Sequence, residues 1–518
     1  MRSTVKQILL SLVLLLSSAG GLIVEIVAGR LIAPYVGMSL YTWTAIIAVV
    51  LAGLSIGHWI GGRLADARVD ERTALTRLAL SLALAGVTTL ASLALLRLLS
   101  SVLVNSGIGP IGVVLLLCAA LFLLPSLLVG VVAPIVTKLA VDLSGGNPGP
   151  AIGRMYAIGT LGSIGGTLAA GYLFISWIGS TWTIVVVAGT YGGLALGCAI
   201  ASRRGGTVVP SVVLLILAAG LVTISARVDA FRTACTVESD YYCIRIENFS
   251  DVSGQPSALM VLDNLVHGIN DKADPSLLYS PYVHFVDEYA RRHFHRRSDG
   301  KSMSAFFIGG GGYTLPRSWA ETMDDARLLV AEIDPMVTTA ASEQLWLNAD
   351  HPAIEVRHRD ARTVLASLPA SSTFDVVFGD AFHDISVPAH LVSREFNREI
   401  KARLRPRGFY VVNVVDGRGT PSFLAAMVRT LERDFPVVEV WVDVEDWSGP
   451  NADPTVRVTY GVVASEAHSP DRIMTSLFGI DRQWKMIRGS GPFEALVDVA
   501  PTLTDDFAPV DRLLSGLL

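Results

Sequence analysis

Long apolar segments dominate the first 226 residues of the chain, whereas most of the charged residues follow residue 227. A helix that crosses a membrane needs roughly 20 apolar residues, because the hydrocarbon core offers no partner for backbone polar groups. This rule predicts seven spans, and they lie near residues 7–28, 40–62, 74–98, 109–132, 152–177, 181–201 and 208–226. We therefore expect a seven-helix transmembrane domain over residues 1–226.

The first apolar segment allows two interpretations. Its letters SSAGG resemble the cleavage region of a signal peptide. The apolar run nevertheless continues through GGLIVEIVAG, so we favour a retained transmembrane helix.

Regularly spaced glycines predict that the spans pack together as a bundle. Gly53, Gly57 and Gly61 repeat every four residues, as do Gly162 and Gly166. This spacing places the glycines on one face of a helix, where the backbone of a second helix can approach closely. A single anchoring helix would not need such a face.

Two ionisable residues, Glu25 and His58, lie inside predicted spans. Ionisable groups within a membrane are costly and commonly mark a functional site. A buried structural pair, or side chains that reach the interface, would explain them equally well.

The positions of Lys and Arg predict the orientation of the spans, because short cytoplasmic loops are enriched in these residues. They fall on alternate loops, at Arg2 and Lys6, at Arg63, Arg68 and Arg72, at Lys138 and Arg154, and at Arg203 and Arg204. The segments SSVLVNSGIGP and SWIGST on the other side carry no charge. A multi-pass protein of the cell membrane with a cytoplasmic N-terminus is expected, and seven spans would place the C-terminal half outside the cytoplasm.

The pattern after residue 227 predicts strands. Within residues 233–268, the stretches TVESDYYCIRIEN and SALMVLDNLVHG are rich in β-branched and aromatic residues and flank the turn-prone FSDVSGQPS. We expect a small β-hairpin subdomain over residues 227–300.

From residue 301 to 518, strands alternate with helices. Strands are expected at 305–308, 327–332, 353–357, 374–379, 408–414 and 437–443, and VRVTYGVVAS predicts a last, antiparallel strand. This alternation predicts a mostly parallel sheet with helices on both faces, that is, a Rossmann-like domain of the class I methyltransferase type.

The first four of these strands end in residues suited to ligand binding. Such sheets bind ligands at the carboxyl ends of their strands. Strand one is followed by glycines at 309–311, which allow a close backbone approach, and strand two by Glu332, which can accept both hydroxyls of a ribose. Asp360 follows strand three and Asp380 follows strand four. The two acids fit an adenosyl-sulfonium compound better than a dinucleotide.

Composition and charge narrow the choice of partners. The chain has 518 residues, of which 51% are hydrophobic and 17% charged, which is too apolar for an ordinary soluble enzyme. A net charge of -5 without a basic stripe argues against nucleic acid as a partner. The lipid bilayer and a small molecule are the partners we expect.

The C-terminal motifs resemble those of the spermidine synthase (polyamine aminopropyltransferase) family, and the whole chain resembles its bacterial membrane-fused branch. The matching stretches are VESDYYCIRI, LMVLDNLVHG, FIGGGGYTLPR, EIDP, RDAR and GDAFHD followed by VPAHL. In the membrane half, EIVAGRLIAPYVG, GLSIGHWIGGRLAD and GRMYAIGTLGSIGGTLAAG also resemble that branch.

The resemblance implies transfer of an aminopropyl group from decarboxylated S-adenosylmethionine to an amine such as putrescine, without a metal, and a possible homodimer. It implies Asp380 as the acid that orients and deprotonates the amine, with Tyr282 or Tyr279 beside it. The implied donor-binding residues are Gly309, Gly310, Gly311, Glu332, Asp334, Asp360, Ala361 and His267, and the implied substrate-binding acids are Asp274 and Asp384.

Two departures from the family pattern bear on the substrates. The acid that grips the donor's amino group in soluble members is replaced by Gly312, and the acidic substrate-binding stretch is replaced by DPSLLYSPYVH. A polyamine needs several carboxylates around it. Unmodified S-adenosylmethionine, as used by a methyltransferase, therefore remains an alternative donor, and a transporter or sensor built on the bundle remains an alternative function.

The four cysteines are too few for a disulfide framework, and Cys118 and Cys198 fall in apolar runs. Cys235 and Cys243 lie just beyond the last span, where they form either a disulfide or two separate thiols. A disulfide would persist only in an oxidising compartment. That location agrees with the seven-span topology but conflicts with the cytoplasmic synthesis of the expected donor.

Overall fold

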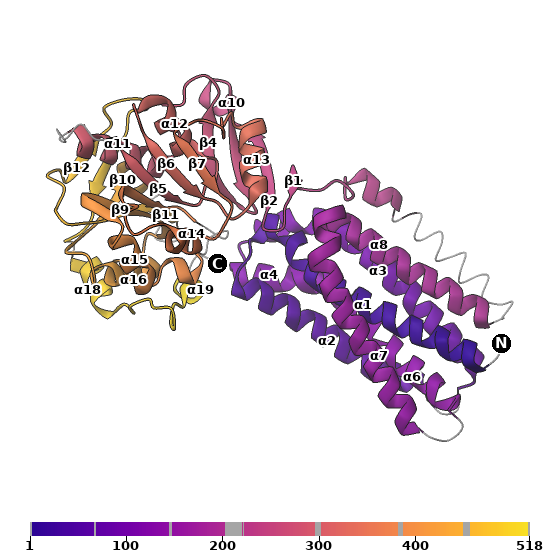
Figure 1. The fold of residues 1–518 in the computed structure, drawn as a ribbon. Helices are drawn as coiled ribbons and strands as arrows, with labels where there is room; N and C mark the ends of the chain where they lie inside the picture. The colour runs from indigo at the N-terminus through magenta and orange to yellow at the C-terminus, as the bar shows by residue number, and fades with distance from the viewer. Residues whose placement is uncertain are drawn as a thin grey trace. The chain divides into compact units, whose positions relative to one another are not determined.

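The structure is a computed structural model, and it describes residues 3–66, 69–144, 148–202, 220, 222–295, 302–381, 387–448, 456–489 and 491–515. The chain forms two compact units, Met1–Cys243 and Ile244–Leu518. The first unit is helical and the second is built on a large sheet (Figure 1).

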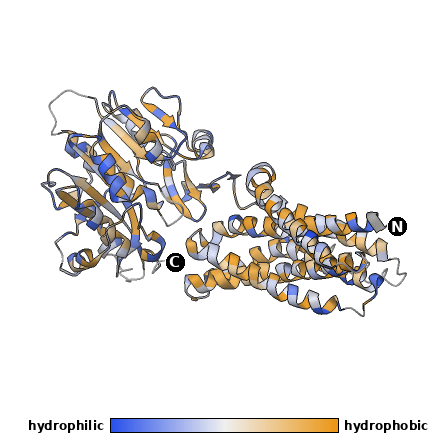
Figure 2. Cartoon of the chain, turned by 60° about the horizontal axis from the view of Figure 1, so that its bottom comes forward, coloured by the Kyte–Doolittle hydropathy of each residue, from blue (hydrophilic) through white to orange (hydrophobic). Residues whose placement is uncertain are grey.

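The helices of the first unit are long and apolar. Five of its described segments are long and apolar enough to cross a membrane, and they are Val5–Val36, Leu40–Leu64, Glu71–Val104, Pro110–Asp142 and Pro148–Ser202. Coloured by hydropathy, these helices are mostly hydrophobic (Figure 2). Length and composition are therefore compatible with the expected membrane bundle.

The number of segments differs from the predicted seven for two reasons. The segment Pro148–Ser202 comprises α7 (Pro148–Ala169), the π-helical turn η2 (Ala170–Phe174) and α8 (Ile175–Ser202), and its helical geometry is broken at Gly179, where φ is 74°. This break separates the predicted spans 152–177 and 181–201. The seventh predicted span, 208–226, lies mostly outside the described residues.

The remaining helices of this unit are α1 (Ser3–Val36), α2 (Leu40–Leu64), α3 (Glu71–Val104), α4 (Pro110–Cys118), η1 (Ala119–Leu123), α5 (Leu124–Gly130) and α6 (Val132–Asp142). α1 continues without interruption through SSAGG and packs against α7 and α8. Retention of the first segment stays a prediction.

The regularly spaced glycines lie where two helices pack closely, as the sequence predicts. A methyl group added at Gly57 of α2 would lie 2.1 Å from the carbonyl oxygen of Leu127 in α5. One added at Gly162 of α7 would lie 2.2 Å from the carbonyl oxygen of Leu15 in α1. Because no real Cβ approaches backbone atoms so closely, any larger residue at these positions would push the paired helices apart.

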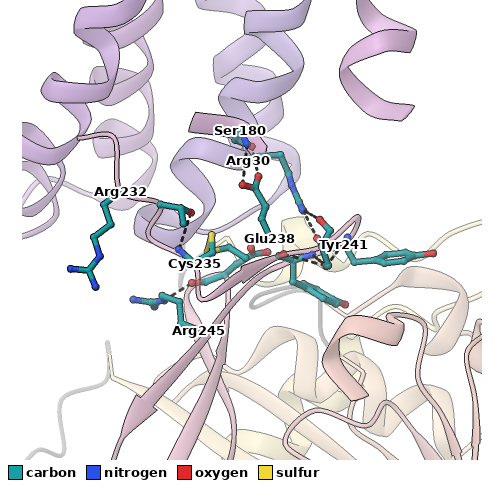
Figure 3. The surroundings of a disulfide bond; sticks show 12 residues. Arg30, Ser180, Arg232, Cys235, Glu238, Tyr241 and Arg245 are labelled. Atoms are coloured by element: carbon teal, nitrogen blue, oxygen red, sulfur yellow. Dashed lines mark hydrogen bonds between the residues drawn. A yellow bond between two sulfur atoms is a disulfide. The ribbon is translucent and has the colours of Figure 1, made fainter. Parts of the chain in front are cut away.

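A disulfide joins Cys235 to Cys243, which confirms the first of the two sequence interpretations (Figure 3). The segment that it closes contains β1 (Val237–Glu238) and is tied to the helices of the same unit. Arg30 of α1 donates hydrogen bonds to the carbonyl oxygens of Ser239 and Tyr241, and the backbone N–H of Ser180 in α8 donates to the Glu238 carboxylate at 3.0 Å.

The small sheet has the strand order β1-β2-β3-β4. β2 (Cys243–Asn248) pairs antiparallel with β3 (Ser257–Leu262), and β3 pairs antiparallel with β4 (Leu265–Asp271). The strands confirm the β-rich character expected for residues 233–268. A short helix, α10 (Ser250–Ser253), lies between β2 and β3, and α11 (Pro281–His295) follows the sheet.

The large sheet has nine strands in the order β12-β13-β10-β11-β9-β8-β5-β6-β7. Its strands are β5 (Ser304–Ile308), β6 (Arg327–Ala331), β7 (Ile354–Arg357), β8 (Phe374–Gly379), β9 (Leu404–Gly417), β10 (Val437–Asp443), β11 (Arg457–Ser465), β12 (Ile473–Thr475) and β13 (Gln483–Met486). β5 to β9 pair in parallel, and β11 pairs antiparallel with β9 and β10. Every strand predicted in this region is present, and the Rossmann-like expectation agrees with the order.

Besides α10 and α11, the described helices of the second unit are α12 (Thr314–Thr322), α13 (Pro335–Gln344), α14 (Ala361–Ser367), η4 (Ala389–Leu391), α15 (Arg394–Lys401), α16 (Ser422–Leu431), α17 (Val444–Ser448), α18 (Gly491–Val499) and α19 (Val510–Leu513). All residues of β5 and β8 are buried, as expected for parallel strands covered on both faces. The strand order reverses between these two strands, which is where such sheets bind ligands.

Candidate active site

The glycine loop after β5 is held against the end of β8. The N–H of Asp380 donates to the carbonyl oxygen of Ile308 at 2.9 Å. Gly309 has a φ of 97°, and a Cβ at this position would lie 2.7 Å from the Asp380 carbonyl oxygen. Only glycine combines this backbone conformation with such a close approach. The loop therefore brings Asp380 to the switch point of the sheet.

Glu332, at the end of β6, is fixed by two backbone hydrogen bonds. One carboxylate oxygen accepts from the N–H of Gly310 at 2.7 Å, and the other accepts from the N–H of Asp334 at 2.9 Å. Burial raises the pKa of Glu332, and these N–H donors partly oppose that rise. The side chain thus lies against the glycine loop, where the sequence places it.

Asp380 lies in a hydrogen-bonded network with residues from two other elements. Its Oδ1 accepts from Asn413 Nδ2 in β9 at 2.7 Å, and its Oδ2 accepts from the hydroxyl of Tyr282 in α11 at 3.2 Å. Burial raises the pKa of Asp380 to about 7, although both hydrogen bonds act to lower it. The group therefore exchanges its proton near neutral pH.

Tyr279 and Tyr282, which the sequence treats as alternatives, take part in different networks. Tyr282 reaches Asp380, whereas the Tyr279 hydroxyl donates to Oδ2 of Asp271 at 3.0 Å. Burial raises the pKa of Asp271, but hydrogen bonds from the N–H groups of Asp274 and Ala273 and from Tyr279 hold it below its usual value. Asp271 is therefore a second carboxylate beside the segment DPSLLYSPYVH, and it is ionised at neutral pH.

The end of β4 contacts the glycine loop. The N–H of Gly312 donates to the His267 carbonyl oxygen at 3.1 Å, and Asn270 Nδ2 donates to the Gly312 carbonyl oxygen at 2.9 Å. A Cβ at position 312 would lie 2.8 Å from the Cα of Gly268. The loop therefore has no space for the acid that soluble members of the resembling family carry at this position.

Asp360 caps α14 and contacts a histidine. Its Oδ1 accepts from the N–H of Thr363 at 3.0 Å, and its Oδ2 lies 2.7 Å from His390 Nε2. Burial raises the pKa of Asp360, but the hydrogen bonds from His390 and Thr363 hold it below the usual value. The buried Ala361 is the first residue of that helix.

The other predicted residues are placed as follows. Asp334 caps α13 by accepting from the N–H of Met336, and Asp274 accepts from the N–H of Ser276 at 2.8 Å. Asp384 lies outside the described residues. The ligand-binding roles expected for these three side chains stay predictions.

Sequence reasoning missed Asn413, Asp271 and His390. Asn413 is an isolated polar residue in the apolar run FYVVNVVDG, a signal that could have identified it. Asp271 belongs to no recognisable pattern and is identified only through its contact with Tyr279. His390 lies in the stretch VPAHL, but only its contact with Asp360 assigns it to the site. Among the described residues, no group of three or more His, Cys, Asp or Glu side chains is arranged to hold a metal ion.

Comparisons with known proteins give two sequence relatives of the same type. The chain is 33% identical over 130 residues to a polyamine aminopropyltransferase of Vibrio vulnificus, covering 25% of this chain and 43% of the relative. It is 33% identical over 121 residues to a probable polyamine aminopropyl transferase of Bifidobacterium longum, covering 23% of this chain and 26% of the relative. The chain thus spans less than half the length of either relative. No family model matches the chain.

Among solved structures, the chain is similar to a probable spermidine synthase from Corynebacterium glutamicum. The two share 20% identity with a TM-score of 0.44, and the match covers 54% of this chain and 98% of the other. The inference of family membership rests on the two sequence relatives and not on this structure. They support the expected membership of the spermidine synthase (polyamine aminopropyltransferase) family.

Proposed function

We propose that the second unit transfers an aminopropyl group from decarboxylated S-adenosylmethionine to an amine such as putrescine. The observation that carries the proposal is the position of Asp380. It lies at the switch point beside the glycine loop, hydrogen-bonded to Tyr282 and Asn413, with a pKa of about 7. A carboxylate poised in this way is suited to accept a proton from a nucleophile at neutral pH.

The residues around the loop suit an adenosyl group. Each oxygen of Glu332 accepts one backbone N–H, and an ionised carboxylate offers about four acceptor positions, so positions remain for the ribose hydroxyls. Gly309, Gly310 and Gly311 leave the backbone open to close approach, and Asp360 and Ala361 start the helix that would border the adenine. The bound donor supplies a sulfonium centre, which makes its aminopropyl carbon electrophilic.

Asp380 takes the proton in the proposed reaction. Tyr282 and Asn413 hold its carboxylate in place while an amine nitrogen forms the new C–N bond to the aminopropyl carbon. The C–S bond breaks, its electron pair stays on sulfur, and the product is neutral methylthioadenosine. The proton of the alkylated amine passes to Asp380 Oδ2 or Oδ1, so charge and atoms balance without a metal or redox partner.

The cationic amine requires negative charge near its far end. Asp271, held ionised by its hydrogen bonds, and Asp274 are the acids on the segment that contains Tyr279. Asp384 completes the proposed set of acids, and His267 belongs to the proposed donor-binding residues. The sequence stretch DPSLLYSPYVH supplies fewer acids than the family pattern implies, so the amine site favours a short diamine.

Position 312 bears on the choice of donor. The close contact with Gly268 leaves no space for an acidic side chain at position 312. No acid at this position can therefore hold the donor's amino group or repel a donor carboxylate. Unmodified S-adenosylmethionine is therefore the second candidate donor, and with it methyl transfer is the alternative reaction. A role limited to transport or sensing has no comparable support in the second unit.

We also propose that the second unit faces away from the cytoplasm. The Cys235–Cys243 disulfide supports this location, because such bonds persist in oxidising compartments. The distribution of Lys and Arg among the predicted loops points in the same direction. An enzyme in this location would need the donor to reach it from the cytoplasm.

The two donors can be separated by steady-state kinetics. The purified full chain should give a higher kcat/KM with decarboxylated S-adenosylmethionine and putrescine than with intact S-adenosylmethionine and any amine. The control is Asp506→Asn, which removes an exposed carboxylate and should leave both values unchanged. Formation of S-adenosylhomocysteine from the intact donor at the higher rate would overturn the proposed donor and favour methyl transfer.

A further inference from the structure

A pocket of about 360 Å³ lies within the helical unit, between α1, α2, α5, α6 and α7. Its polar lining consists of Ser17, Ser18, His58, Thr137, Tyr156, Thr160 and Ser163. Small-molecule sites have volumes of about 300–1,000 Å³, so the pocket is large enough for a small organic ligand. The candidate reaction uses residues of the other unit and gives this pocket no role.

Several of these polar groups lack a protein partner. Ser17 and Thr160 donate to the carbonyl oxygens of Leu14 and Tyr156 in their own helices, at 3.2 Å and 3.0 Å. In contrast, the side chains of Ser18, His58, Thr137 and Ser163 form no hydrogen bond within the described part of the chain. Unsatisfied polar groups are costly in hydrocarbon and mark substrate pathways in membrane proteins.

An acidic residue lies beside the pocket. Gly21 and Leu22 of α1 line the pocket, and Glu25 follows them by four and three residues. Residues at these spacings share one face of a helix, so Glu25 lies on the same face of α1, one turn beyond the pocket lining. Glu25 has no ion pair or hydrogen bond within the described residues, and no Lys or Arg lines the pocket.

We propose that this pocket binds a protonated linear alkyl amine. The ammonium group lies at Glu25, the methylene chain lies along the apolar lining, and a second polar end reaches His58 and the hydroxyl groups. The acid favours a cation, and the apolar part of the lining suits a methylene chain. The choice of an amine among organic cations rests on the proposed function, because the bundle then holds the compound class that the second unit uses.

Binding of radiolabelled spermidine to the purified full chain, without donor, tests the proposal. Glu25→Gln removes the counter-charge, and Ser163→Leu fills the pocket; each should weaken binding at the bundle site at least tenfold. The matched control, Glu71→Gln, makes the same chemical change at the start of α3, where the carboxylate is paired with Lys6. It should bind spermidine like the wild type.

The outcomes separate this proposal from the proposed function. Asp380→Asn should still bind spermidine at the bundle site. Spermidine binding can therefore be measured even if the chain does not transfer aminopropyl groups. Unchanged spermidine binding in both Glu25→Gln and Ser163→Leu would overturn the amine site. Equal binding of suberate, a dianion of similar length to spermidine, would do the same. Retention of a phospholipid that Ser163→Leu displaces, with spermidine binding unaffected, would identify a lipid as the occupant instead.

Discussion

Replacement of Asp380 by Asn removes one charge and little else. The oxygen of an asparagine can still accept from Asn413 Nδ2, and its amide N–H can donate to the Tyr282 hydroxyl. The shape of the site and its hydrogen bonds are therefore retained, while the proton acceptor is lost. General-base catalysis contributes roughly 10²- to 10⁴-fold to rate, so turnover should fall by about that factor with donor binding unchanged.

The pKa of about 7 makes the effect dependent on pH. The carboxylate is about one tenth ionised at pH 6 and about nine tenths ionised at pH 8, so its contribution to kcat/KM should rise roughly tenfold across this range. The amine substrate also loses protons as the pH rises. Dividing the wild-type rate by the Asp380→Asn rate at each pH cancels that contribution, and the ratio should increase with a midpoint near pH 7.

The contribution of Asp380 to folding stability should fall as the pH rises, whereas its contribution to the rate should increase. The folded-state pKa of Asp380 is raised by burial from 3.8 to about 7, so the folded state binds the proton more tightly than the unfolded state. Its contribution to stability is complete below about pH 4 and is lost as the pH rises toward 7. At pH 8, Asp380→Asn should therefore unfold at a temperature equal to or above that of the wild type.

Rates of methylthioadenosine formation and thermal unfolding curves, measured between pH 6 and pH 8.5, check both expectations. A wild-type to variant rate ratio that is flat across this range would contradict Asp380 as the proton acceptor. Loss of methylthioadenosine binding in Asp380→Asn, seen by calorimetry, would show that the residue holds the donor and not the amine.

Three further predictions concern the donor site, the disulfide and the location of the second unit. Glu332→Gln should weaken methylthioadenosine binding about tenfold or more by calorimetry, because hydrogen bonds to a charged acceptor contribute about 1.5–3 kcal/mol each. The control Glu343→Gln changes an exposed carboxylate and should bind methylthioadenosine like the wild type. Equal affinities of the two variants would exclude Glu332 from the donor site. The intact mass of the purified chain should rise by two hydrogens on reduction, and an unchanged mass would contradict the Cys235–Cys243 disulfide. A membrane-impermeant thiol reagent should label Val499→Cys, a site that is 79% exposed, on intact cells; labelling only after lysis would place the second unit in the cytoplasm.

The sheet of the second unit could be predicted because its strands are short apolar runs bounded by glycine, proline and acidic residues. β5 and β8 are buried on both faces, so their sequences are mostly apolar, with Ser304 and Asp375 as the polar exceptions. β12 and β13 were not predicted, because they are short and lie at the sheet edge, where burial no longer selects a pattern.

The proposed site was only partly predictable, because side-chain networks depend on elements distant in sequence. Asp380 and Asn413 are separated by 33 positions and meet only because β8 and β9 are neighbouring parallel strands. Tyr279 and Tyr282 differ by three positions, yet the first precedes α11 and reaches Asp271, whereas the second lies in the first turn of that helix and reaches Asp380. Spacing alone could not choose between them.

The helical unit shows a similar limit. The glycine repeats predicted close packing because their period of four matches one face of a helix, and Gly57 and Gly162 are indeed in contact with neighbouring backbones. The pocket lined by His58 could not be predicted, because it forms between helices whose relative positions no local pattern determines.

The central claim is that this chain moves an aminopropyl group, and the most direct test is the identity and ratio of its products. The purified full chain, given decarboxylated S-adenosylmethionine and isotope-labelled putrescine, should form labelled spermidine and methylthioadenosine in a one-to-one ratio by mass spectrometry. Asp380→Asn should form both at the reduced rate and Asp506→Asn at the full rate. Methylthioadenosine without an alkylated amine, or no product with either donor, would contradict the account.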